Sequence, residues 1–181
     1  MSSIPFSFKG LVVALAAITI VAAGCGSDDG GAADGGGADA TSGVAASDLE
    51  MVEISNGAET NLEAVLANED GKPKLAWFWA PHCSTCRGEA PELDEFIATN
   101  SDQVDMVGIG SRDDYELAEG FLADTGVVNF PLYWEETGQS WVDNAVAAQP
   151  YMILFVDGED VERWPGGASV RQLEDALVQY G

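Results

Sequence analysis

The sequence is poor in the residues that bind metals and nucleic acids. It has 3 cysteines, 1 histidine and only 7 lysines and arginines against 31 aspartates and glutamates, which gives a formal net charge of −24. Phosphates would repel such a chain, so nucleic acid and the surface of anionic lipids are excluded as direct partners. A structural zinc site needs about four ligands, and only Cys25 and His82 could join the pair Cys83 and Cys86. We expect neither a metal nor another cofactor, and we interpret the acidity as a highly solvated surface.

Long apolar runs are also scarce. Residues 10–23 form a run of apolar or small residues after Lys9. The run is too short for a membrane span, which needs about 20 residues, but it fits the core of a secretory signal. Residues 21–25 (VAAGC) resemble a lipobox, in which Cys25 would be acylated and become the new N-terminus. Ala22 stands where leucine is usual, so an ordinary cleaved signal with a stray Cys25 remains the alternative.

The segment after Cys25 cannot bury a core. Residues 26–46 are nearly all glycine, alanine, aspartate, serine or threonine, which predicts a flexible tether. We therefore divide the chain into a lipoprotein signal peptide (1–24), a tether that begins with lipidated Cys25 (25–47), and one folded domain (48–181). The expected location is the extracytoplasmic face of a cell membrane, held by the lipid anchor, or the secreted fraction.

The most informative motif is the closely spaced pair Cys83 and Cys86. It lies between an apolar run at 75–79 and a helix-like run at 92–98. Cysteines at i and i+3 of a helix share a face, so their sulfurs can close a disulfide. The first would lie near free N–H groups and the positive end of the helix dipole, which favour its thiolate. The spacing predicts a redox pair, because so short a loop adds little as a purely structural disulfide.

Apolar periodicity predicts alternating strands and helices in the folded domain. We expect the 51–54 strand to lie at an edge of the sheet, Leu117, Phe121 and Leu122 to face the core, and Pro91 to kink its helix. The pattern predicts an α/β fold with a central mixed sheet and helices on both faces. The expected strands are 51–54, 74–79, 104–109, 132–134, 151–156 and 161–164, and the expected helices are 61–67, 83–99, 115–125, 140–147 and 170–180.

Together these motifs resemble the thioredoxin superfamily. Residues 78–86 (FWAPHCSTC) and 89–91 (EAP) are similar to the TlpA/ResA/DsbE-like class of exported thiol–disulfide oxidoreductases. The resemblance covers residues 52–180 and implies a thioredoxin-like fold. Residues 108–112 (GIGSR) and the Gln-Pro at 149–150 are similar to the secreted DsbE-like proteins of actinobacteria.

The resemblance implies roles for the residues that would carry the chemistry. Cys83 would be the exposed nucleophile that forms the mixed disulfide, and Cys86 would be the buried resolving thiol. Pro150 would be the cis-proline that faces the disulfide, and the backbone of Gln149 could pair with an extended substrate. Pro131 is a rival for this role, and an ordinary proline at the start of a strand is the alternative.

Four further residues near the cysteine pair in the sequence have either a functional or a structural interpretation. His82 stands where this family often has tryptophan, and it could favour the Cys83 thiolate or be an exposed rim residue. Trp77 occupies the position of a buried aspartate in thioredoxin, so that acid is absent. Glu89 matches a glutamate of ResA-like proteins and could relay a proton, or it could be a plain carboxylate on the helix surface. Trp79 could shield the disulfide or belong to the core.

We therefore expect a thiol–disulfide oxidoreductase, and the resemblance favours oxidative folding of exported proteins. The alternatives are a reductase of apocytochrome c cysteines and a noncatalytic lipoprotein binding module whose cysteines stay locked. A peroxide-reducing enzyme is disfavoured, because Ala80 and Pro81 stand where such enzymes usually carry threonine. The expected partners are exported proteins with thiols or disulfides and a membrane redox partner that regenerates the pair. We expect a monomer.

Overall fold

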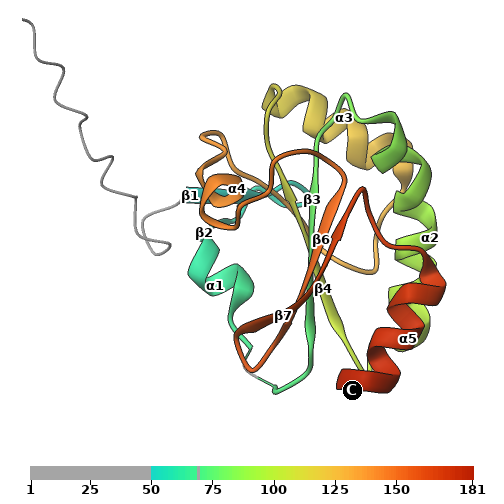
Figure 1. The fold of residues 1–181 in the computed structure, drawn as a ribbon. Helices are drawn as coiled ribbons and strands as arrows, with labels where there is room; N and C mark the ends of the chain where they lie inside the picture. Colours follow the sequence, from blue (N-terminus) through green and yellow to red (C-terminus); the bar gives the residue numbers. More distant parts are fainter. Residues whose placement is uncertain (1–49, 69) are drawn as a thin grey trace, which may run out of the picture. The chain divides into compact units, whose positions relative to one another are not determined.

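The computed structural model describes residues 50–68 and 70–181. The predicted signal peptide, the tether and Cys25 lie outside the described residues. The described chain forms one seven-stranded sheet with helices on both sides, which confirms the predicted α/β class (Figure 1). Within the described ranges, no helix combines the length and the apolar character needed to span a membrane.

Most elements begin and end close to their predicted positions. The elements in chain order are β1 (Glu50–Glu53), β2 (Glu59–Asn61), α1 (Leu62–Leu66), β3 (Lys74–Trp79), α2 (Ser84–Asn100), β4 (Asp105–Gly110), α3 (Tyr115–Thr125), β5 (Leu132–Trp134), α4 (Gln139–Asp143), β6 (Tyr151–Val156), β7 (Glu159–Pro165) and α5 (Val170–Tyr180).

The sheet is mixed, and its strand order is β2-β1-β5-β4-β3-β6-β7. Strands β3, β4 and β5 are parallel, whereas β6, β7, β1 and β2 join by antiparallel pairing. The expectation that residues 51–54 form an edge strand is wrong, because β1 lies between β2 and β5. Strand β2 consists of Glu59-Thr60-Asn61 and contains no apolar residue, so periodicity gave no signal for it.

Strand β3 is buried on both faces. Phe78 packs edge-on against Trp141 of α4, with 5.9 Å between ring centroids. Trp77 and Trp79 pack against Phe121 of α3, at 6.2 and 4.2 Å. Because consecutive strand residues point to opposite faces, α4 and α3 cover different sides of the sheet. Figure 1 shows α1 and α4 on one side and α2, α3 and α5 on the other.

Two details of the predicted helices need correction. Leu117 does not face the core, because it is 50% exposed, whereas Ala118 and Phe121 of α3 are fully buried and Leu122 is partly buried. The buried stripe follows the spacing 118, 121 and 122, and Leu117 lies just outside it. The predicted 140–147 helix is short, since α4 ends at Asp143 and the chain turns at Ala145 with φ 55°.

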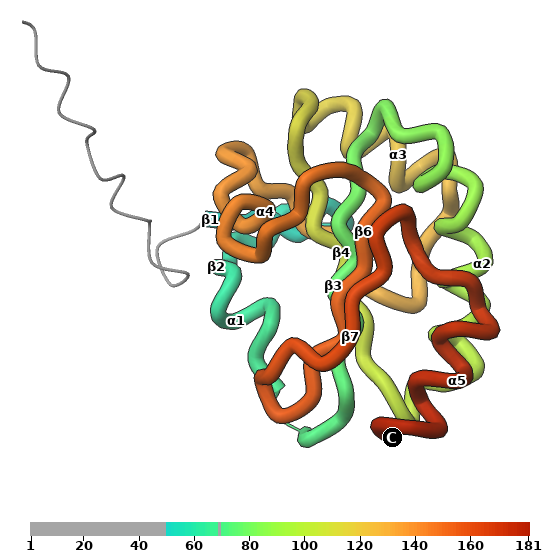
Figure 2. Tube along the Cα trace, in the orientation of Figure 1, coloured from blue at the N-terminus to red at the C-terminus, as the bar shows by residue number. Residues whose placement is uncertain are grey.

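The C-terminal helix follows the prediction closely. Ser169 is its N-cap and forms a capping box with Gln172, which satisfies backbone donors at both positions. Leu173, Ala176 and Leu177 are buried. Helix α5 lies beside α2, as Figure 2 shows, so it supports the helix that begins at the cysteine pair.

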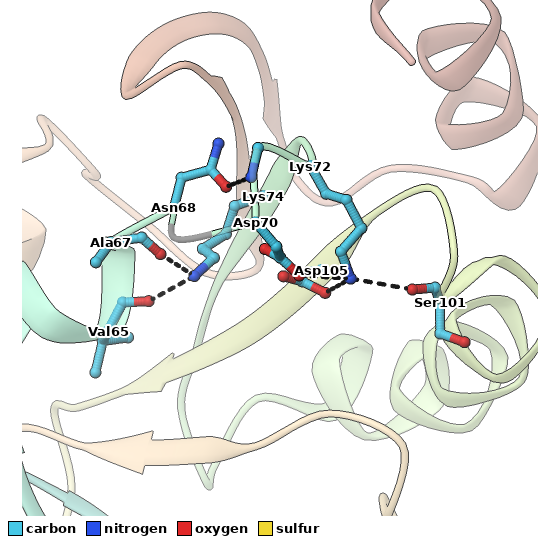
Figure 3. Close-up of polar contacts among 9 residues, drawn as sticks. Val65, Ala67, Asn68, Asp70, Lys72, Lys74, Ser101 and Asp105 are labelled. Carbon is cyan, nitrogen blue, oxygen red and sulfur yellow. Dashed lines mark hydrogen bonds and ion pairs between the residues drawn. The ribbon is translucent and has the colours of Figure 1, made fainter.

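Two lysines anchor the amino end of β3 (Figure 3). Lys72 Nζ lies 2.7 Å from the Asp105 carboxylate at the start of β4. Lys74 Nζ donates to the carbonyl oxygens of Val65, at 3.4 Å, and of Ala67. These carbonyls lie at the C-terminal end of α1, where a cation is favourable. The contacts fix the end of β3 that is farthest from Cys83.

Candidate redox site

Cys83 and Cys86 are joined in a disulfide at the start of α2. The S–S distance is 2.12 Å and the Cα atoms are 5.2 Å apart. Cys83 is the N-cap of the helix, and its Sγ accepts a hydrogen bond from the Cys86 N–H at 3.1 Å. Cys86 is fully buried, and Cys83, which was predicted to be exposed, is largely buried as well, with 8% of its surface accessible. An incoming thiolate would therefore meet Cys83 first, and the helix terminus would stabilise the thiolate that Cys83 forms.

His82 bridges two loops beside the disulfide. Its Nδ1 lies 2.8 Å from the Asp113 carboxylate in the loop after β4. Its Nε2 lies 2.9 Å from the side-chain nitrogen of Gln149. The peptide bond between Gln149 and Pro150 is cis. The structure thus brings His82, Gln149 and Pro150 together, and it adds Asp113, which the sequence reasoning missed.

Arg112 also connects the loop after β4 to the loop that carries Gln149. Its guanidinium lies over the Trp141 ring at 4.4 Å. It also donates to the backbone oxygens of Val146, at 3.3 Å, and Ala147, at 3.1 Å. These contacts fix the segment that leads to Gln149. Sequence reasoning included Arg112 in a family motif but assigned it no contact.

Arg87 fixes the turn that precedes Cys83. Its Nε donates to the Pro81 carbonyl at 3.2 Å, and its NH1 pairs with Asp124 of α3 at 2.9 Å. The guanidinium also lies 5.1 Å from the centre of the Phe121 ring. A single cation therefore ties the redox turn to α3. Sequence reasoning missed this contact, because its partners lie far along the chain.

Glu89 lies one turn after Cys86 and does not project into solvent. It is half-buried, and Trp77 Nε1 donates to its Oε1 at 2.6 Å. On its other side a Cβ at Gly167 would lie 2.4 Å from Oε2. Burial raises the pKa of Glu89 from 4.5 to about 7; the Trp77 hydrogen bond opposes this rise, and the negative charge of Glu92 adds to it. The carboxyl group can therefore take up or release a proton near neutral pH.

Trp79 is part of the hydrophobic core. It is fully buried and lies against two glycines of β4. A Cβ at Gly110 would lie 2.7 Å from the Trp79 ring, and one at Gly108 would lie 2.3 Å from Leu132 and 3.1 Å from Trp79. The glycines of the 108–112 motif therefore make room for this indole.

The remaining candidate features are the second proline and any group of metal ligands. Pro131 directly precedes β5, and within residues 50–68 and 70–181 the cis bond is the one at Pro150. No group of three or more histidine, cysteine, aspartate or glutamate residues in the described part of the chain is arranged to hold a metal ion. The groups of the site that can exchange electrons or protons include the two sulfurs and the Glu89 carboxyl group.

Comparison with known proteins finds thioredoxins and related disulfide oxidoreductases. Residues 53–133 match the thioredoxin family model. The chain is 33% identical over 110 residues to a thioredoxin of Mycolicibacterium smegmatis, covering 59% of this chain and 80% of that protein. It is 34% identical over 89 residues to the soluble secreted antigen MPT53 of Mycobacterium tuberculosis, covering 49% of this chain and 50% of the antigen. The match thus spans only half the length of that relative.

A solved structure extends the comparison to most of the described chain. It is a secreted Mycobacterium tuberculosis disulfide oxidoreductase homologous to Escherichia coli DsbE. The two chains superpose with a TM-score of 0.59 at 29% identity, covering 72% of this chain and 95% of the other. The resemblance to exported DsbE-like proteins is thereby confirmed.

Proposed function

The chain belongs to the thioredoxin family, and on that premise we propose that it exchanges disulfides with exported proteins through Cys83 and Cys86. The observation that carries the proposal is the disulfide at the N-terminus of α2, in which Cys83 keeps 8% exposure and Cys86 is fully buried. Such a pair separates attack by a substrate from resolution of the mixed disulfide. The family resemblance favours oxidative folding over reduction.

In the oxidising direction, a substrate thiolate attacks Cys83 Sγ and breaks the bond to Cys86. Cys86 leaves as a thiolate, and the substrate is joined to Cys83 in a mixed disulfide. A second substrate thiolate then attacks the substrate sulfur of that bond and releases the Cys83 thiolate. Two electrons pass from the substrate dithiol to the protein. The reverse sequence reduces a substrate disulfide.

Glu89 would supply a proton to Cys86 when this buried sulfur leaves. The two residues lie one helical turn apart on α2, and neighbouring turns of a helix share a face. A pKa of about 7 leaves Glu89 partly protonated at neutral pH. A buried thiolate is costly in apolar surroundings, so a nearby acid would ease both formation and opening of the disulfide.

The substrate would approach along the loop that carries Gln149. Tyr151 of β6 is paired with Phe78 of β3, so the chain just before Tyr151 reaches the end of β3 from which the turn to Cys83 departs. An extended segment could pair there with the backbone of Gln149 in the manner of an added strand. This arrangement would align a substrate cysteine with the sulfur of Cys83.

We place this activity outside the cytoplasm, with the domain tethered to the membrane through lipidated Cys25. Support comes from the apolar run at 10–23, the lipobox-like residues before Cys25 and the secreted relatives. A membrane redox partner would regenerate the pair. Expression of a Cys25→Ser variant tests the anchor, since it should move the protein from the membrane fraction to the soluble fraction. Unchanged membrane attachment would contradict it.

The decisive test is the reduction potential of the Cys83–Cys86 pair, combined with single substitutions. A potential near −120 mV would identify an oxidant, whereas one near −270 mV would favour the reducing alternative, such as action on apocytochrome c. Cys83→Ser should abolish exchange, and Cys86→Ser should trap a mixed disulfide on Cys83. A Cys83→Ser variant that keeps its partners and its activity in cells would indicate a noncatalytic binding module instead.

A further inference from the structure

The loop bridge formed by Asp113, His82 and Gln149 lies beside the redox pair, and the exchange steps proposed above do not use it. We propose that His82 and Asp113 are positioning residues that hold Gln149 in place for the docking of an extended polypeptide on Cys83. The inference rests on the proposed exchange function and adds to it a basis for selecting polypeptides over small thiols.

The first argument is that both ring nitrogens of His82 are occupied. Nδ1 pairs with the Asp113 carboxylate at 2.8 Å, and Nε2 pairs with the Gln149 amide at 2.9 Å. The sulfur of Cys83 instead receives its hydrogen bond from the backbone N–H of Cys86. The imidazole therefore joins two loops, and its polar atoms are not directed to the reacting sulfur.

The second argument is that the bridge can form in either charge state of the ring. With a neutral imidazole, Nδ1–H donates to Asp113 and Nε2 accepts from the amide of Gln149. With a protonated ring, Nε2–H donates, and the same amide can turn its oxygen toward the ring. The contact is thus suited to holding a position.

The third argument is that the neighbouring Arg112 fastens the same pair of loops. Its guanidinium binds the backbone oxygens of Val146 and Ala147 and packs on Trp141. Arg112 therefore fixes the backbone that leads into the loop, while Asp113 and His82 fix the Gln149 side chain at its end. Arg112 and Asp113, which are consecutive in the loop after β4, thus set the position of the loop that carries Gln149.

The fourth argument is exposure. The His82 side chain is 53% exposed and that of Asp113 is 19% exposed, and Gln149 is partly buried. The bridge therefore lies at the protein surface next to Cys83, where an extended polypeptide would cover it. A small thiol offers far fewer atoms than a polypeptide for contact with this bridge.

The test compares two dithiol substrates of the oxidised full-length chain. One is dithiothreitol, and the other is a short linear peptide with two cysteines. We expect His82→Ala and Asp113→Ala to lower the rate constant for the peptide, relative to that for dithiothreitol, by about threefold to tenfold, the effect of one net hydrogen bond. The equilibrium constant of the pair with glutathione should stay within about twofold.

Two further variants sharpen the result. Asp114→Ala removes the same charge from the next residue, whose side chain makes no capping bond, and it should leave the peptide preference unchanged. His82→Gln should retain much of the preference, because an amide can donate to Asp113 and accept from Gln149.

Three outcomes would overturn the inference. An equal slowing of both substrates in His82→Ala would show that His82 acts on the sulfur. Identical behaviour of Asp113→Ala and Asp114→Ala would show that the bridge holds nothing, and a defect in His82→Gln as large as in His82→Ala would count against it as well. A wild-type chain that oxidises neither dithiol would contradict the proposed exchange function before the bridge is tested.

Discussion

The two ends of strand β3 carry polar clusters of opposite character. At the amino end, Lys72 pairs with both Asp70 and Asp105 (Figure 3). The hydrogen bond from Lys72 lowers the pKa of Asp70, and the bonds to Asp105 and Asp70 raise the pKa of Lys72. Toward the carboxyl end, Trp77 of β3 contacts Glu89 of α2, whose pKa is raised by burial.

This difference separates a structural cluster from a chemical one. The lowered pKa of Asp70 and the raised pKa of Lys72 keep these two groups ionised over the physiological range. Glu89 has the indole N–H of Trp77 as its hydrogen-bond donor, and a neutral donor offsets only part of the cost of burying a charge. A carboxyl group held near its titration point beside a cysteine pair is an expected mark of a functional site.

The largest expected effect on stability comes from removing the buried ionisable group of Glu89. Because its pKa is about 7 in the folded chain against an ordinary 4.5, the folded state binds the proton more tightly. Stability should therefore fall as pH rises through this window. Glu89→Gln abolishes the cost and should raise the free energy of unfolding at pH 8 by about 2–3 kcal/mol, allowing for partial solvation. Denaturant unfolding at pH 8 and at pH 5 measures it.

Glu95→Gln is the matched control for this variant. Glu95 is exposed on the same helix, so its replacement should give no comparable gain. Equal stability gains in the two variants, or a Glu89→Gln gain that does not shrink at pH 5, would contradict the buried titration. The same Glu89→Gln variant should slow disulfide exchange near neutral pH if the carboxyl group supplies a proton to Cys86.

A smaller effect is expected when the contact of Glu89 with Gly167 is disturbed. Gly167 has φ +89°, and an added Cβ would lie 2.4 Å from Glu89 Oε2. Gly167→Ala should lower the free energy of unfolding by about 1–2 kcal/mol through backbone strain. It should also displace the carboxylate and weaken the dependence of stability on pH.

Gly166 offers a control with the same backbone and no clash. It has φ +90°, and an added Cβ would meet nothing within 4 Å. Gly166→Ala should therefore cost similar stability but leave the pH dependence intact. If both alanine variants keep the wild-type pH dependence, the Gly167 contact does not position Glu89.

The smallest effect is expected at the amino end. Lys74→Met removes the donor to the carbonyl oxygens of Val65 and Ala67, which should cost about 1 kcal/mol. The rate of disulfide exchange should stay unchanged, because the cluster lies at the other end of β3. Thermal unfolding and the dithiothreitol assay check the two halves of this prediction. Loss of exchange in a folded Lys74→Met protein would show that the two ends are coupled.

Much of the fold could be read from the sequence because its signals are local. The apolar run of β3, the Ser169 cap and the cysteine spacing each lie within a few residues. The partners of the site residues could not be found this way, because Asp113 lies 31 positions after His82 and Gln149 lies 67 after it. The reason for the glycines of β4 could not be found from the sequence either, because it is the close packing of β4 against Trp79 in the folded structure.

The hydrogen bond between Trp77 and Glu89 also gives the protein a built-in optical reporter. The indole N–H faces a group that changes from acid to carboxylate near neutral pH. Within residues 50–68 and 70–181, the indole N–H groups of Trp79 and Trp141 have no hydrogen-bond partner, and the indole N–H of Trp134 donates to Glu136. The emission of Trp77 should therefore follow the ionisation of Glu89, so that proton movements beside the cysteine pair can be recorded without an attached dye.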